Sequence, residues 1–255
     1  MSEILWYNFL FIVARIASFF VTLPITSYRG VPNIVKVFFA LVFSYLIFLS
    51  RDFSYLSVNS YTSIRLFLLL GGEIITGLVL GFVVLLFFSV FRMAGQFADV
   101  KIGLSMASIF DPQFAGSVTL IGQFYYLLTI IIYFALNGHH HLFLAINQSF
   151  EIMPIGGSAL TDITIRLVFD SFYYIWLMAF QIAAPVVAAI LITDISLGLI
   201  SKTVPQLQVF MVGLPLKFFI GLLVLYLTLP YLALMMEGVF DRLYVDLLRI
   251  MESMV

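Results

Sequence analysis

Residues 66–91 read LFLLLGGEIITGLVLGFVVLLFFSVF, and Glu73 is the one charged side chain in this run. A helix needs about 20 apolar residues to cross a bilayer, so the run is more than long enough. The chain contains six apolar blocks, at approximately residues 4–23, 34–49, 66–91, 118–136, 171–201 and 212–236. These blocks predict an all-α fold: an integral membrane-type helical protein with kinked or broken hydrophobic helix hairpins.

The composition supports the same class. Hydrophobic residues make up 63% of the 255 residues and charged residues 10%, against about 25% charged residues in soluble domains. A soluble fold of this length cannot hide so much apolar surface, because every fold leaves a large share of its surface in solvent. The net charge of −1 offers no basic surface for nucleic acid, and the absence of cysteine excludes disulfides. We expect residues 1–255 to form a single membrane domain.

Three segments predict departures from simple spanning helices. The stretch 92–120 is too polar to cross lipid; its spacing predicts an amphipathic helix to about Phe110, ended by Asp111-Pro112. The overlong fifth block contains Pro185, which predicts a break or a kink at the proline. Two half-length helices that form a hairpin would explain the excess length of the block. The tail at about 238–254 places apolar residues on one stripe and predicts a separate amphipathic helix.

The positive charges do not decide the orientation of the chain. Lys and Arg in cytoplasmic connections normally do so, but successive connections here are almost equally basic. This pattern is typical of a weakly biased membrane protein. It is also typical of apolar helices that pack against other proteins instead of crossing lipid as simple spans.

Four charged side chains lie in apolar surroundings: Arg15, Glu73, Asp194 and Lys217. A charge at membrane depth costs several kcal/mol unless it is paired, neutral or hydrated. One interpretation is buried charge pairing that fixes helix register, within the chain or between subunits. The second is a proton or ion relay. The third is that some of these side chains reach the membrane interface.

Glycine and histidine patterns carry weaker signals. Gly77 and Gly81 form a GxxxG pattern, which places two glycines on one helix face for the close approach of a partner helix. Three adjacent histidines, 139–141, point about 100° apart on a helix, so they predict the start of an interfacial helix and not a metal site. The chain lacks the GxxxxGK[ST], HExxH and GxSxG motifs, so we predict no enzyme activity and no cofactor.

The motifs in the middle and at the end of the chain are similar to those of a known family. They are ExxxGxxxG at 73–81, AGQ at 94–96, GxxMAxxxDPQ at 103–113, LNGHH at 136–140, SF at 149–150, Pro154, AP at 184–185, LGL at 197–199, PQxxVF at 205–210, GxPxK at 213–217 and Gly221. In this order and spacing they resemble the FliR/SctT family of the type III secretion export gate. The resemblance covers residues 13–231, and it adds Gly213 and Gly221 to the expected helix-packing glycines.

The resemblance implies a role in protein transport. Members of this family assemble with FliP and FliQ into a helical export gate, on which FlhB docks, in the bacterial inner (cytoplasmic) membrane at the flagellar basal body. The gate passes unfolded flagellar export substrates. The MAxxxDP stretch favours the flagellar branch over an injectisome export gate. The competing class is a proton-coupled small-molecule transporter, with Glu73 and Asp194 as the titrating pair.

The stretch from Met106 to Leu120 predicts a plug across the closed export channel. Met106, Ile109, Phe110 and Phe114 can fill a pore, since flexible Met and bulky Phe form a water-excluding seal that still reshapes around a passing chain. The family resemblance points to the same segment, because FliR-like proteins contribute a loop that occludes the gate.

Overall fold

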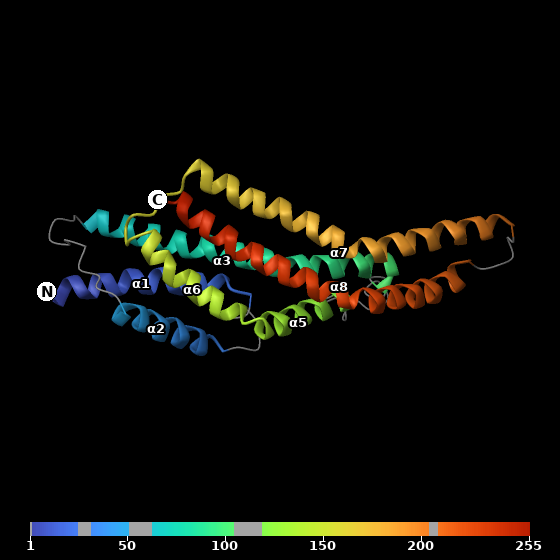
Figure 1. Ribbon diagram of the computed structural model, residues 1–255, viewed down its shortest axis with the longest axis horizontal. Coiled ribbons are helices and arrows are strands. Elements are labelled where there is room, and N and C mark those ends of the chain that lie inside the picture. Colours follow the sequence, from blue (N-terminus) through green and yellow to red (C-terminus); the bar gives the residue numbers. More distant parts are fainter. Residues whose placement is uncertain (1, 25–31, 51–62, 105–118, 204–208) are drawn as a thin grey trace. The chain divides into compact units, whose positions relative to one another are not determined.

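The computed structural model describes residues 2–24, 32–50, 63–104, 119–203 and 209–255. The described residues form seven helices and no strand (Figure 1). The helices are α1 (Ser2–Thr22), α2 (Asn33–Ser50), α3 (Ser63–Ile102), α5 (Leu120–Ala135), α6 (Gly138–Ile152), α7 (Asp162–Thr203) and α8 (Val209–Ser253). The prediction of an all-α membrane-type protein is therefore confirmed.

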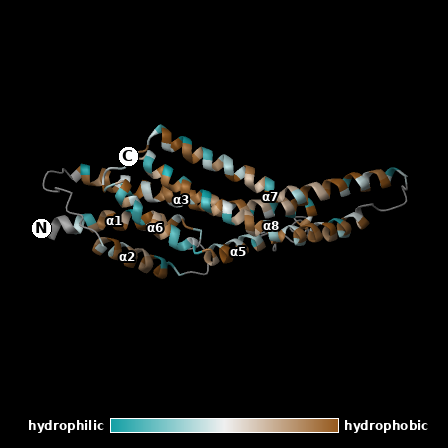
Figure 2. Cartoon of the chain, viewed as in Figure 1, coloured by the Kyte–Doolittle hydropathy of each residue, from teal (hydrophilic) through white to brown (hydrophobic). Residues whose placement is uncertain are grey.

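Hydrophobic residues predominate along the helices, with hydrophilic residues scattered among them (Figure 2). By length and composition, four helices in the described part of the chain could cross a membrane: α2, α3, α7 and α8. The number rises to five if the broken pair of α5 and α6 counts as one span. At 40, 42 and 45 residues, α3, α7 and α8 are each about twice as long as the hydrocarbon core of a bilayer requires.

The prediction of one amphipathic helix that follows Arg92 and runs to about Phe110 is wrong for the described residues, which end here at Leu104. α3 begins at Ser63, runs through the polar stretch after Arg92, and ends at Ile102. Gly103 follows with φ +93°, a left-handed conformation that glycine adopts without a Cβ clash, and its N–H donates to the carbonyl oxygen of Asp99 at 3.1 Å. The Asp111-Pro112 dipeptide lies outside the described residues.

The predicted hairpin at Pro185 is also wrong, as is the separate tail helix. α7 continues through Pro185, and α8 continues through Pro215, Pro230 and Gly238 to Ser253. A proline removes a single N–H donor, which a helix packed among other apolar helices tolerates. An isolated glycine weakens a helix without ending it, so the tail is simply the last part of α8.

The contacts divide the chain into two compact units. The first comprises residues 1–87, 137–172 and 240–255, and the second comprises residues 88–136 and 173–239. The boundaries between the units fall within α3, α7 and α8, so each of these helices contributes one part to each unit.

In the first unit, aromatic edges join α1 to α2: the ring centroids of Phe9 and Phe48 lie 5.6 Å apart. The end of α8 lies beside the start of α7 (Figure 1). There the hydroxyl groups of Thr161 and Thr164 donate to the carbonyl oxygen of Ser253, at 2.8 and 3.1 Å. These bonds satisfy a carbonyl at the end of α8 that has no partner within its own helix.

In the second unit, the C-terminal part of α3 supplies fully buried apolar side chains to the core, including Phe88 and Phe91. The ring of Phe88 meets the ring of Tyr133 on α5 edge-on, with centroids 5.0 Å apart. Phe97 of α3 lies beside Trp176 of α7, with ring centroids 6.1 Å apart. Aromatic packing therefore joins α3 to both α5 and α7 in this unit.

Candidate functional site

A fully buried ion pair joins α1 to α3 in the first unit. The Nε of Arg15 donates to Oε2 of Glu73 at 2.5 Å, and both side chains are 0% exposed. The second carboxylate oxygen, Oε1, accepts the backbone N–H of Gly156 at 2.9 Å. Both oxygens of Glu73 are thus hydrogen-bonded, as a buried carboxylate requires.

The remaining nitrogens of Arg15 bind the end of α6. Nη1 donates to the carbonyl oxygens of Ser149 at 2.9 Å and Met153 at 3.1 Å, and Nη2 donates to that of Met153 at 3.0 Å. The guanidinium carbon lies 4.3 Å from the centre of the Phe150 ring. The carbonyl groups at the end of a helix carry partial negative charge, so a cation there is stabilising. Arg15 therefore fixes α1, α3 and α6 together.

The glycines of the GxxxG pattern face α1 at the level of this ion pair. A Cβ on Gly81 would lie 2.7 Å from the carbonyl oxygen of Phe19 and would overlap the hydroxyl of Thr22. A Cβ on Gly77 would overlap the carbonyl oxygen of Arg15 and the hydroxyl of Ser18. The helix that approaches this glycine face in the first unit is thus α1 of the same chain, and the approach lets Glu73 reach Arg15.

Asp194 and Lys217 form an ion pair between α7 and α8 in the second unit. The lysine side chain is 25% exposed and the aspartate side chain 40% exposed, so this pair is far less buried than Arg15–Glu73. In water, such a pair contributes about 0–1 kcal/mol. The four charges singled out from the sequence thus meet as two separate pairs, one in each unit.

The other two expected packing glycines lie on α8 in the second unit. A Cβ on Gly221 would lie 2.5 Å from two side-chain carbons of Ile102, and a Cβ on Gly213 would lie 3.2 Å from Leu197. At Gly213 the neighbour is the end of a leucine side chain, so a substitution there costs less than one at Gly77 or Gly81, where the obstacle includes backbone. At Gly221 the neighbour is the buried, β-branched side chain of Ile102, which cannot easily move aside.

Asp99 is a polar group that the sequence analysis missed. Its carboxylate on α3 is 1% exposed and accepts the backbone N–H groups of Ile121 and Gly122 at the start of α5. A Cβ on Gly95, one turn earlier on α3, would lie 2.5 Å from Cα of Gly122. One signal in the sequence could have identified Asp99: it is a charged residue that follows Phe97 and Ala98 in a segment predicted to be helical.

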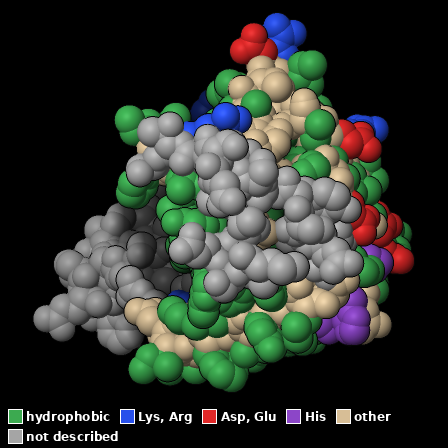
Figure 3. Space-filling model, turned by 90° about the vertical axis from the view of Figure 1, so that its left-hand side faces the viewer, with side chains coloured by type: hydrophobic (Ala, Val, Ile, Leu, Met, Phe, Trp, Pro, Cys, Tyr) green, Lys and Arg blue, Asp and Glu red, His purple; other side chains and the backbone are tan. Residues whose placement is uncertain are grey.

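The predicted plug residues, Met106, Ile109, Phe110 and Phe114, lie outside the described residues. The histidines occupy the first turn of α6 as predicted, and in Figure 3 the histidine side chains lie at the surface beside acidic ones. Within the described ranges, no group of three or more His, Asp or Glu side chains is placed to hold a metal ion.

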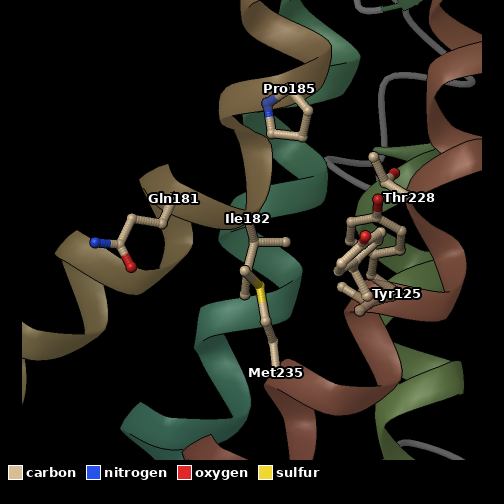
Figure 4. Close-up of a pocket in the computed structure, with 8 residues that line it drawn as sticks. Tyr125, Gln181, Ile182, Pro185, Thr228 and Met235 are labelled. Carbon is tan, nitrogen blue, oxygen red and sulfur yellow. The ribbon is translucent and has the colours of Figure 1, made fainter.

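The second unit contains a half-open cavity of about 300 Å³ (Figure 4). Its walls come from α5, α7 and α8, and its lining residues are Tyr125, Gln181, Ile182, Pro185, Thr228, Tyr231, Leu232 and Met235. All of these side chains are apolar or neutral, and the hydroxyl of Thr228 donates to carbonyls of its own helix, Val224 and Leu225, at 3.0 Å each. The cavity therefore presents a mainly apolar surface with a few neutral polar groups.

The amino-acid sequence is similar to those of known proteins along most of its length. The family model for bacterial export proteins, family 1, matches residues 6–243. The chain is 32% identical to the flagellar biosynthetic protein FliR of Bacillus subtilis, over 91% of this chain and 90% of that protein. It is 27% identical to the FliR proteins of Aquifex aeolicus (90% and 88% covered) and Escherichia coli (94% and 91% covered). A match over nearly the whole membrane region, at this identity, shows that the chain belongs to family 1 of the bacterial export proteins, together with the FliR proteins.

Proposed function

We propose that the chain is a structural subunit of the flagellar type III protein export gate. With FliP and FliQ it forms the channel through which unfolded flagellar subunits are exported, and FlhB docks on this assembly. The gate lies in the bacterial inner membrane, within the flagellar basal body. The chain performs no catalysis, and the energy for export comes from outside it.

The observation that carries this proposal is the match along nearly the whole chain to flagellar biosynthetic proteins. The lengths of α3, α7 and α8 support it, since helices about twice as long as a bilayer core extend beyond the hydrocarbon layer or tilt strongly within it. These helices also expose apolar side chains, such as Phe169, Trp176 and Leu227. In an assembled gate, helices of the partner subunits would cover such side chains.

Two alternatives make different predictions. An injectisome export gate would use the same architecture with other substrates. A proton-coupled transporter would need Glu73 to exchange protons with water, but Glu73 is 0% exposed in the first unit and both of its oxygens are hydrogen-bonded. The geometry favours a structural role for this carboxylate.

Co-purification tests the assembly. We expect the tagged chain, co-expressed with FliP and FliQ, to purify in detergent as one complex, and we expect the chain expressed alone to aggregate or to be degraded. The physical reason is the large exposed apolar area of α2, α7 and α8, which partner helices would cover. Size-exclusion chromatography coupled to native mass spectrometry measures the outcome. A stable monomer or dimer that ignores FliP and FliQ would contradict the proposal and support the transporter.

We further propose that Met106, Ile109, Phe110 and Phe114 seal the idle channel. Deleting residues 109–116, or replacing Phe110 and Phe114 by Gly, is expected to make cells with the assembled gate permeable to small ions, because the apolar filling of the pore is lost. Ion flux into cells or proteoliposomes measures the leak.

The control is the pair Phe110→Leu and Phe114→Leu, which keeps bulky apolar side chains and is expected to stay tight. If the deletion assembles with its partners and the membrane remains tight, the seal lies elsewhere in the complex.

A further inference from the structure

We infer that Asp99, with Gly95 and Gly122, forms a clamp that holds the start of α5 against α3 and so positions both ends of the connection between residues 103 and 119. This inference rests on the proposed gate function, because it assigns the clamp the task of positioning the sealing residues. Three features of the second unit carry it.

The first feature is the capping of α5. The N–H of Gln123 makes the first bond inside the helix, to the carbonyl oxygen of Thr119 at 2.9 Å, so the N–H groups before it need other acceptors. Asp99 Oδ2 accepts those of Ile121 at 3.0 Å and Gly122 at 3.2 Å, and Oδ1 also accepts that of Ile121 at 3.2 Å. A carboxylate is favourable here because a helix N-terminus carries partial positive charge.

The second feature is contact between the two backbones. A Cβ on Gly95 would lie 2.5 Å from Cα and 2.6 Å from the backbone nitrogen of Gly122. A Cβ on Gly122 would lie 3.1 Å from the carbonyl oxygen of Arg92 on α3. Only glycine at both positions permits this approach, and the approach brings the N–H groups of α5 within reach of the short Asp99 side chain.

The third feature is the other end of the connection. The carbonyl oxygen of Asp99 accepts the N–H of Gly103 at 3.1 Å, and Gly103 with φ +93° ends α3. One residue therefore fixes the point where the chain leaves α3, through its backbone, and the point where it enters α5, through its side chain. The two described ends of the connection are therefore bonded to the same residue of α3.

Hydrogen exchange tests the clamp without reference to export. In the purified complex, Asp99→Ala is expected to raise the exchange rates of the amides of Ile121 and Gly122 about tenfold or more, because they lose a charge-assisted acceptor. Asp99→Asn keeps one acceptor oxygen and is expected to give a smaller increase. Peptides covering the start of α5 report this by mass spectrometry. Unchanged exchange rates in Asp99→Ala would overturn the clamp.

Ion leak tests what the clamp does. The matched control is Asp246→Ala, which removes another buried carboxylate, one that accepts the Ser171 hydroxyl at 3.2 Å in the first unit. We expect Asp99→Ala to increase the leak of the idle gate about tenfold over the wild type, and Asp246→Ala to leave it unchanged. Faster exchange at α5 without any added leak would overturn the positioning role.

Two further variants keep the result interpretable. If Asp99→Ala fails to assemble, Asp99→Asn replaces it in both measurements. We then expect a smaller rise in the exchange rates and in the ion leak. No change in either quantity would contradict the inference. Deletion of residues 109–116 separates the two proposals. If cells with that deletion do not leak ions, the proposed seal is wrong. The clamp is tested separately, by the exchange rates of the amides at the start of α5.

Discussion

Arg15→Ala is expected to destabilise the first unit by about 3–5 kcal/mol, because it leaves the Glu73 carboxylate buried without its cation. The same change removes the hydrogen bonds from Arg15 to the carbonyl oxygens of Ser149 and Met153 at the end of α6. A loss of this size is a large fraction of the about 5–15 kcal/mol by which folded domains are typically stable. We therefore expect the variant to disappear from the membrane fraction, as measured by immunoblotting and by the yield of complex with FliP and FliQ.

The matched control for Arg15→Ala is Arg242→Ala. The Nε of Arg242 lies 2.8 Å from Oδ1 of Asp246, but the arginine side chain is 43% exposed. The Asp246 side chain is 7% exposed, but it keeps the hydroxyl of Ser171 as a donor when Arg242 is removed. Arg242→Ala should therefore cost less than Arg15→Ala and leave more of the protein in the membrane fraction. If Arg15→Ala accumulates as well as Arg242→Ala, the Arg15–Glu73 pair does not hold the first unit together.

Substitutions of Glu73 separate structural pairing from proton relay. Glu73→Gln keeps an oxygen that can accept from Arg15 or from Gly156, whereas Glu73→Ala removes both acceptors and leaves a cavity. A structural role therefore predicts more export from the Gln variant than from the Ala variant. A relay predicts that both fail, since neither side chain titrates. Export of flagellar substrates into the medium, normalised to the amount of assembled complex, distinguishes the two.

Gly81→Leu and Gly77→Leu are expected to abolish assembly and motility. In the first unit, a side chain at either position would meet backbone oxygen atoms of α1, which cannot move aside without shifting the helix. The cost should therefore exceed the about 1–3 kcal/mol of an ordinary overpacked core. Swimming in soft agar and co-purification with FliP and FliQ measure the effect.

The chain supplies its own control for these glycine substitutions on the same helix. A Cβ on Gly71 meets no atom within 4 Å, whereas a Cβ on Gly81 meets the carbonyl oxygen of Phe19 at 2.7 Å. Gly71→Ala should therefore be neutral or slightly stabilising, since alanine favours a helix over glycine by about 1 kcal/mol, and Gly81→Ala should be destabilising. Normal swimming in both Leu variants would remove the argument for close packing of α1 against α3.

The sequence identified most of the important residues of the candidate site, but it did not indicate which of them contact one another. Arg15, Glu73, Asp194 and Lys217 stood out because charge is costly in apolar surroundings, and Gly77 and Gly81 stood out through their spacing. Their partners could not be read from the chain, since Arg15 and Glu73 are 58 positions apart. Asp99 did not stand out, because its partners are backbone N–H groups, which every residue except proline carries and no sequence pattern marks.

Apolar composition and block length by themselves determined that the chain is helical and of membrane type, since backbone groups in an apolar medium must be satisfied within each segment. Helix ends and helix pairing were decided by tertiary structure. Pro185 and Gly238 signal breaks in isolation, yet α7 and α8 continue through them, because the cost of one lost bond or one flexible residue is smaller than the gain from packing. The end of α3 at Ile102 and the start of α5 at Leu120 are each followed by a residue whose N–H binds Asp99. The bond to α5 forms only when the two helices lie side by side.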